Sequence, residues 1–195
     1  MHANSPVLIA LGANLPSDWG APAETLAAAL ERLEQQGARV LKRSRWWRTP
    51  AFPAGSGPDF VNAAAALETE LPPEGVLALL HAVETEMGRT RPTRWAPRVV
   101  DLDLIACADL IAPDRETAER WLRLDPAEAM KQAPEAMILP HPRLHERGFV
   151  LAPLNDVAPD WRHPLLGRTV AELLAALPVE ALDGMAPLED AANRT

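Results

Sequence analysis

Cysteine and long apolar runs are both scarce in this sequence of 195 residues. Its single cysteine, Cys107, excludes an intramolecular disulfide and a zinc site built from several cysteines, and it favours a reducing compartment. The longest early apolar run, Val7 to Leu11, is far shorter than a membrane span and follows no basic stretch, so it predicts a buried strand. We therefore expect a cytoplasmic protein with no membrane partner.

Positive charge is also in deficit. Acidic side chains outnumber basic ones by 27 to 19, and the formal net charge is -8. This balance argues against broad, sequence-independent attraction to nucleic acid, so we expect no nucleic-acid partner. The basic residues are concentrated early in the chain, which leaves a small anionic ligand compatible with the composition.

The common nucleotide-binding motifs are missing. No Gly-x-x-x-x-Gly-Lys-Ser/Thr loop occurs, and Gly55-Ser-Gly57 lacks the third glycine and the strand-to-helix context of a dinucleotide fingerprint. No period of 20 to 50 residues recurs, which argues against solenoids and propellers. Any nucleotide must therefore be held in another way, by one compact unit.

Apolar spacing predicts six elements in the order βαββαβ. Strands are expected at residues 7–11, 40–47, 60–69 and 100–105, and helices from residue 22 to a stop at Gly37 and from residue 73 to a stop at Gly88. This order is that of the ferredoxin-like α+β architecture, an antiparallel sheet with helices on one face.

The rest of the chain is expected to decorate this core. Residues 108–136 are predicted to form an insertion with two short helices, and residues 169–177 a last core helix. We expect residues 1–180 to form a single domain and residues 181–195 to form a flexible tail.

Two carboxylates two residues apart are the first candidates for chemistry. In an extended segment, Asp101 and Asp103 project from one face of the strand while Val100, Leu102 and Leu104 face the core. Such a pair suits magnesium, which prefers carboxylate, water and phosphate oxygens. Taken alone, however, the pattern is more typical of a solvated strand face.

The preceding segment changes this balance. Arg89, Arg91, Arg94 and Arg98 lie in a proline-containing stretch that is not regular helix. A nucleoside triphosphate site explains both signs of charge, because carboxylates hold metal ions and arginines neutralise phosphate oxygens. Exposed ion pairs in a structural role would contribute only about 0 to 1 kcal/mol each.

Other polar and aromatic residues are ambiguous by themselves. His81 and Glu84 are three residues apart on one helix face, which an ordinary solvated face explains. His141 is a possible phosphate donor, whereas His145 is more typical of a surface residue. For Phe60 and Phe149, a place in the core is the default interpretation.

The segment Arg94-Trp-Ala-Pro-Arg-Val-Val-Asp-Leu-Asp-Leu-Ile105 and shorter motifs at residues 11–15, 48–50, 58–62, 84–91 and 139–149 occur in a fixed order. With these motifs the sequence closely resembles the 6-hydroxymethyl-7,8-dihydropterin pyrophosphokinase family of folate biosynthesis, from about Val7 to Leu177 apart from the insertion. The resemblance implies transfer of the β,γ-pyrophosphoryl group of ATP to the pterin hydroxymethyl oxygen, with release of AMP.

The resemblance also implies roles for individual residues. Asp101 and Asp103 would hold two magnesium ions, and Arg89 and Arg91 would be catalytic arginines of a mobile loop that closes over the phosphates. The ATP-binding residues would be His81, Glu84, Arg98, His141 and Arg147. The pterin-binding residues would be Gly12, Thr49, Pro50, Phe60, Asn62, Trp95 and Phe149. The ring would stack between the two phenylalanines, and the amide would read its polar edge.

Two features depart from the family pattern. The insertion at residues 108–136 is longer than expected, and a solvated helical decoration explains it better than a lid or a partner surface. Phe60 stands where family members often carry tyrosine, so the stacking surface is kept and a hydroxyl is lost. No side chain is an obvious general base, and transfer with two metals need not have one. We expect a monomer.

Two rival functions belong to other classes. The ferredoxin-like topology is shared with RNA-binding modules, and Arg45-Trp-Trp-Arg48 combines stacking and charge, but the net charge of -8 opposes this hypothesis. A two-metal phosphodiesterase using Asp101 and Asp103 would turn over phosphate diesters without any pterin.

Overall fold

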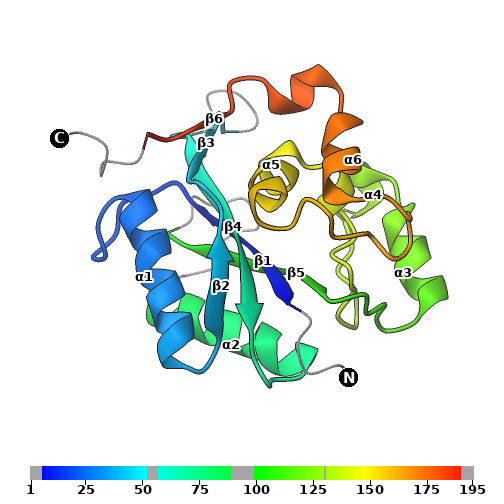
Figure 1. Cartoon of the computed structure of the whole chain (residues 1–195), viewed down its shortest axis with the longest axis horizontal. Helices are drawn as coiled ribbons and strands as arrows, with labels where there is room; N and C mark the ends of the chain where they lie inside the picture. The colour runs from blue at the N-terminus through cyan, green and yellow to red at the C-terminus, as the bar shows by residue number, and fades with distance from the viewer. Residues whose placement is uncertain (1–5, 52–56, 89–98, 130, 190–195) are drawn as a thin grey trace.

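The computed structural model describes residues 6–51, 57–88, 99–129 and 131–189. Its centre is an antiparallel sheet with the strand order β5-β1-β4-β3-β6, and β2 also pairs with β4 (Figure 1). The strands are β1 (Val7–Ala13), β2 (Arg39–Arg43), β3 (Trp47–Thr49), β4 (Phe60–Glu68), β5 (Asp101–Cys107) and β6 (Ala186–Pro187). The α+β, ferredoxin-like prediction is confirmed.

One expected strand is divided in two. The segment predicted at residues 40–47 forms β2 and β3, which pair in turn with the two ends of β4. Between them, Ser44 donates its N–H to Ala64 O at 2.9 Å and accepts from Ala64 N–H through its hydroxyl, also at 2.9 Å. The buried serine therefore satisfies backbone groups where the two strands meet.

Two helices cover one face of the sheet, as expected. They are α1 (Pro22–Gln35) and α2 (Pro73–Glu86), and each has a proline in its first turn, where no intrahelical donor is needed. The Glu24 carboxylate accepts from Ala21 N–H at 2.7 Å and satisfies one more backbone group at the start of α1. The predicted apolar stripes are buried: Leu26, Leu30, Leu33, Val76, Leu80, Val83 and Met87.

The opposite face is covered by α5 (Gly148–Val157) and α6 (Val170–Ala175) (Figure 1). Val150, Leu151 and Leu154 of α5 pack with Ala64 and Ala66 of β4 in a second apolar cluster. Small side chains on β4 let the helix approach closely. Because α5 covers only part of this face, the remainder is left for polar residues.

The insertion contains α3 (Arg115–Leu122) and α4 (Pro126–Ala129). Its two ends are held together by Ala112 and Leu139, whose backbones exchange hydrogen bonds at 3.0 and 3.1 Å. The predicted helical insertion is thus an excursion between two paired residues, and it does not interrupt the sheet.

The C-terminal region differs from the expected flexible tail. Residues 179–182 form the short 3-10 helix η2 (Val179–Leu182), and β6 then pairs with β3. Residues 190–195 lie outside the described residues. Within the described part of the chain, no helix is both long and apolar enough to cross a membrane.

Candidate active site

A row of paired residues crosses the face of the sheet that also carries α5. The strand register pairs Gly12 of β1 with Asn62 of β4 on one side and with Asp101 of β5 on the other. Trp47 of β3 pairs with Asn62 and extends the row. Directly paired residues point to the same face, so the side chains of Asp101 and Asn62 share one face and their Cα atoms lie about 10 Å apart with Gly12 between them.

Gly12 leaves room for the Asn62 side chain. A Cβ at residue 12 would lie 2.8 Å from Asn62 Oδ1, closer than carbon and oxygen can approach. The Asn62 amide is buried and donates through Nδ2 to Thr49 Oγ1 at 2.6 Å. The amide is therefore held in one position by its neighbours on both sides.

The two aspartates of β5 lie as the alternation predicts. Asp101 and Asp103 are half-buried, while Val100, Leu102 and Leu104 are buried against α1 and α2. No group of three or more His, Cys, Asp or Glu side chains among the described residues is arranged to hold a metal ion. Two carboxylates on one face are ligands that suit magnesium, which also takes phosphate and water oxygens.

His141 and Arg147 face this acidic pair from the loop before α5. The His141 N–H donates to Ile105 O of β5 at 2.8 Å, which fixes the loop beside the edge of the sheet. Burial, together with the Arg147 and Arg143 charges, lowers the pKa of His141 to about 3, although Asp101 acts in the opposite direction. Its Nδ1 accepts from Arg143 N–H at 3.2 Å, so the neutral ring carries its proton on Nε2 and can donate it to an anion.

The charge of Arg147 interacts with both aspartates. Burial lowers the pKa of its guanidinium and the Arg143 charge does the same, whereas Asp103 and Asp101 raise it. The guanidinium carbon lies 5.7 Å from the centre of the Phe149 ring. Arg147 thus connects the acidic pair to the aromatic side chain at the start of α5.

The two phenylalanines differ in exposure. Phe60 is half-buried at the start of β4, opposite Thr49, and Phe149 is 42% exposed. Phe149 is therefore not a core residue, and an exposed aromatic at the end of a polar row suits the face of a planar ligand. Pro50, which follows Thr49, is exposed.

Glu84 and His81 do not share the solvated face that their spacing suggested. Glu84 is 2% exposed and accepts from Leu102 N–H at 2.7 Å, between the two aspartates, while His81 is exposed. The hydrogen bond from α2 to β5 holds the strand that carries the acidic pair. The position of Glu84 therefore suits a structural role in holding β5.

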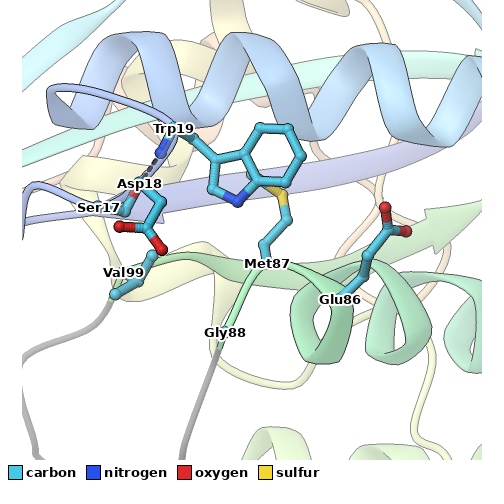
Figure 2. Close-up of a pocket in the computed structure, with 7 residues that line it drawn as sticks. All are labelled: Ser17, Asp18, Trp19, Glu86, Met87, Gly88 and Val99. Atoms are coloured by element: carbon cyan, nitrogen blue, oxygen red, sulfur yellow. Dashed lines mark hydrogen bonds between the residues drawn. The ribbon is translucent and has the colours of Figure 1, made fainter.

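A hollow of about 300 Å³ lies between the loop after β1 and the end of α2 (Figure 2). Its lining residues are Ser17, Asp18, Trp19, Glu86, Met87, Gly88 and Val99. Arg32 lies 4.8 Å over the Trp19 ring and forms an ion pair with Glu86 at 3.4 Å. The hollow thus lies where the chain leaves α2 and where it returns before β5.

Four predicted site residues, Arg89, Arg91, Trp95 and Arg98, lie outside the described residues.

The structure also shows a contact that sequence reasoning missed. Arg45 donates to the Asp156 carboxylate through its backbone N–H at 3.2 Å and through its guanidinium Nε and Nη2 at 3.0 and 2.7 Å. Trp47 Nε1 donates to the same carboxylate at 3.0 Å. The arginine and tryptophan that suggested RNA binding are thus engaged within the protein, where they tie β3 to α5. Only the basic and aromatic composition of residues 45–48 marked this region in the sequence.

Comparison with known proteins decides the family. The model of the family described as 7,8-dihydro-6-hydroxymethylpterin-pyrophosphokinase matches residues 8–159 of this chain. The chain belongs to this family. It is 38% identical over 164 residues to the 2-amino-4-hydroxy-6-hydroxymethyldihydropteridine pyrophosphokinase of Methylorubrum extorquens, covering 84% of this chain and 90% of that protein. It is 36% identical over 178 residues to the enzyme of the same name from Pseudomonas aeruginosa, covering 91% and 94%.

Solved structures agree with the fold of the pyrophosphokinase family. Plasmodium falciparum HPPK-DHPS with pteroate is similar over 90% of this chain, with a TM-score of 0.64 and 14% identity. This chain spans 45% of that longer one. As a pyrophosphokinase, the protein is an ATP- and magnesium-dependent transferase that moves a pyrophosphoryl group in folate biosynthesis.

Proposed function

We propose that the polar row on the sheet joins the two substrate sites of this pyrophosphokinase. Asp101 and Asp103 would hold two magnesium ions with the ATP phosphates, and Asn62 would bind the pterin two strands away. The observation that carries this proposal is the register Asp101–Gly12–Asn62, which sets the Cα atoms of the aspartate and the asparagine about 10 Å apart on one face of the sheet. That spacing leaves room for the pterin hydroxymethyl oxygen to approach the β-phosphorus.

On the phosphate side, this chain contributes charge and a hydrogen-bond donor. Bound magnesium would reduce the repulsion between phosphate oxygens and favour attack at phosphorus. Arg147 and the neutral His141 would donate to phosphate oxygens from the loop beside β5. We assign Arg89, Arg91 and Arg98 to the same phosphates, and His81 and Glu84 to the surroundings of the nucleotide, from the family motifs.

On the pterin side, the chain contributes shape and an amide. The flat ring would lie between Phe60 and Phe149, where stacking adds about 0.5 to 1.5 kcal/mol per ring. The Asn62 amide, held by Thr49, would face the polar edge of the pterin, because an amide offers both donors and an acceptor. Gly12, Pro50 and Trp95 would complete the pocket.

The test replaces each aspartate and measures AMP. With magnesium, ATP and the hydroxymethyl dihydropterin, Asp101→Ala or Asp103→Ala should abolish AMP formation and leave the circular dichroism spectrum unchanged, because both side chains are half-buried ligands outside the apolar core. Asp109→Ala, which removes an exposed carboxylate beyond the end of β5, is the control and should keep wild-type turnover. Undiminished turnover in either variant at residues 101 or 103 contradicts the proposal, and hydrolysis of a phosphate diester without pterin favours the phosphodiesterase.

A separate prediction concerns Arg91. If it stabilises charge during transfer, Arg91→Ala should slow the single-turnover rate by about 100-fold or more and change pterin binding little. Weakened pterin binding at an unchanged transfer rate would instead assign Arg91 to the ground-state complex.

We also infer that the enzyme acts as a monomer in the cytoplasm. The proposed site is formed by residues of one chain, and the single cysteine favours a reducing compartment. Sedimentation equilibrium at micromolar concentration should give a mass near 21.2 kDa. A stable dimer whose dissociation abolishes activity contradicts the first inference.

A further inference from the structure

The C-terminal strap, defined here as residues 178–188, runs from α6 past the start of α5 to the outer edge of β3 (Figure 1). Its strand β6 pairs Pro187 with Trp47 and Ala186 with Arg48. Leu188 then donates its N–H to Trp46 O at 2.7 Å. The strap therefore provides the edge strand beside β3.

The strap contacts the backbone of α5 without space for a side chain. A Cβ at Gly148 would lie 2.3 Å from Ala181 O and 2.9 Å from Leu182 Cδ2. Gly148 is buried and directly precedes Phe149. The position of the strap thus depends on the first turn of α5, and the first turn of α5 depends on the strap.

A second close contact lies on the other side of the proposed pterin pocket. A Cβ at Gly184 would lie 2.7 Å from Pro50 Cγ. Gly184 also has a backbone φ of 71°, which residues with a side chain rarely adopt. Pro50 follows Thr49, which holds the Asn62 amide. The strap is therefore packed against Pro50 at one point and against the residue before Phe149 at another.

We propose that the C-terminal strap is a positioning element for the pterin, and that it sets the separation between β3 and the start of α5. This inference rests on the proposed location of the pterin between Phe60 and Phe149. The family model matches residues 8–159 and does not include the strap. The two closest contacts of the strap are with Gly148 and Pro50, which directly adjoin Phe149 and Thr49, so a displaced strap should affect the pterin more than the nucleotide.

The test compares alanine substitutions at two glycines with similar φ angles. Gly184→Ala forces a carbon against Pro50, whereas Gly167→Ala, at a φ of 66°, places its carbon where no atom lies within 4 Å. Both substitutions strain the backbone, so their difference reports the contact with Pro50. We expect Gly184→Ala to raise the KM for the pterin by about 5-fold or more with the KM for ATP unchanged within about 2-fold, and Gly167→Ala to change neither. Equal effects of the two variants, or equal increases in both KM values, overturn the proposal.

A second variant covers the case in which Gly184→Ala does not fold. Leu182→Ala removes the half-buried side chain that lies against Gly148 without adding a clash, and Leu177→Ala truncates a half-buried leucine just before the strap as its control. Leu182→Ala should raise the KM for the pterin selectively, and an unchanged value overturns the proposal. Failure of the proposed function can be distinguished from failure of this proposal. If the pterin does not bind beside Phe149, Phe149→Ala should bind the pterin as tightly as wild type.

Discussion

Gly12 determines where the Asn62 amide can lie. Gly12→Ala places a carbon 2.8 Å from Asn62 Oδ1, so the amide must move and its hydrogen bond to Thr49 at 2.6 Å is lost or lengthened. We expect the KM for the pterin to rise by about 10-fold, since one oriented hydrogen bond contributes about 1 kcal/mol or more. Steady-state kinetics with each substrate varied in turn measures this change.

The control for Gly12→Ala is Gly57→Ala. At residue 57 the nearest atom to the new carbon is Asn14 Nδ2 at 3.8 Å, an ordinary contact. The two variants lose the same backbone freedom of the unfolded chain but differ in crowding at the site. A similar KM for the pterin in both would contradict the assignment of Asn62 to pterin binding.

Asp156 is the residue that joins β3 to α5. Burial opposes ionisation of its carboxyl, but hydrogen bonds from Arg45 and Trp47 outweigh burial and lower the pKa of Asp156. Asp156→Ala leaves these donors without their acceptor, so the free energy of unfolding at pH 7 should fall by about 1 to 3 kcal/mol. Urea denaturation measures the loss. Asp160→Ala, an exposed aspartate in the turn after α5, is the control and should lose less than about 0.5 kcal/mol.

The sequence predicted features that depend on the local pattern within one strand, but not those that depend on the register between distant strands. The places of Asp101 and Asp103 followed from alternation within one strand, which needs no knowledge of the neighbours. The alignment of Gly12 with Asn62 depends on the pairing of strands 50 residues apart, and periodicity cannot specify that register. Burial of Glu84 was missed for the same reason, because its acceptor role depends on a strand that follows α2 along the chain.

At the scale of elements, the sequence pattern did not predict α5, the helix that packs on the second face of the sheet. Its residues are apolar on nearly all sides because it lies between the sheet and α6, so it has no amphipathic period to detect. Pro153 inside the helix is a further signal against helix in sequence reasoning. In contrast, α1 and α2 each have one buried stripe and a proline start, and the sequence predicted both.

The insertion is an element that the site should not need. Because Ala112 and Leu139 exchange backbone hydrogen bonds, their neighbours can be joined by a short connection without moving the loop that carries His141. Replacing residues 115–136 with about four Gly and Ser residues should keep kcat and both KM values within about 2-fold. The same kinetic assay measures this, with the full-length chain as reference. A selective rise in the KM for ATP would contradict the prediction and assign the insertion to the nucleotide site.

At the scale of the whole molecule, the sheet divides an apolar face from a mixed one. The face under α1 and α2 is closed by apolar side chains, whereas α5 and α6 cover only part of the other. The polar row lies on this second face, where the start of α5 brings Arg147 and Phe149 to the sheet. The family motifs included most of these residues in the sequence, but the placement of the start of α5 beside the sheet depends on tertiary packing that those motifs do not specify.

The stability of the whole molecule should fall in mild acid because of His163. This side chain is fully buried and accepts from Leu165 and Leu166 N–H through Nδ1 at 3.2 and 3.3 Å. Burial, with a smaller contribution from the nearby His145, lowers the pKa of His163 to about 4. The unfolded chain takes up this proton near pH 6.5, before the folded protein does, so the contribution is complete above pH 6.5 and is lost as the pH falls towards 4.

The expected loss between these two pH values is about 3 kcal/mol. His163→Asn keeps an acceptor near the position of Nδ1 and removes the titration, so the variant should be less stable than wild type at pH 8 but should lose less stability between pH 7 and pH 4.5. Urea denaturation at several pH values measures the slopes, and parallel curves for wild type and His163→Asn would show that another group controls acid unfolding.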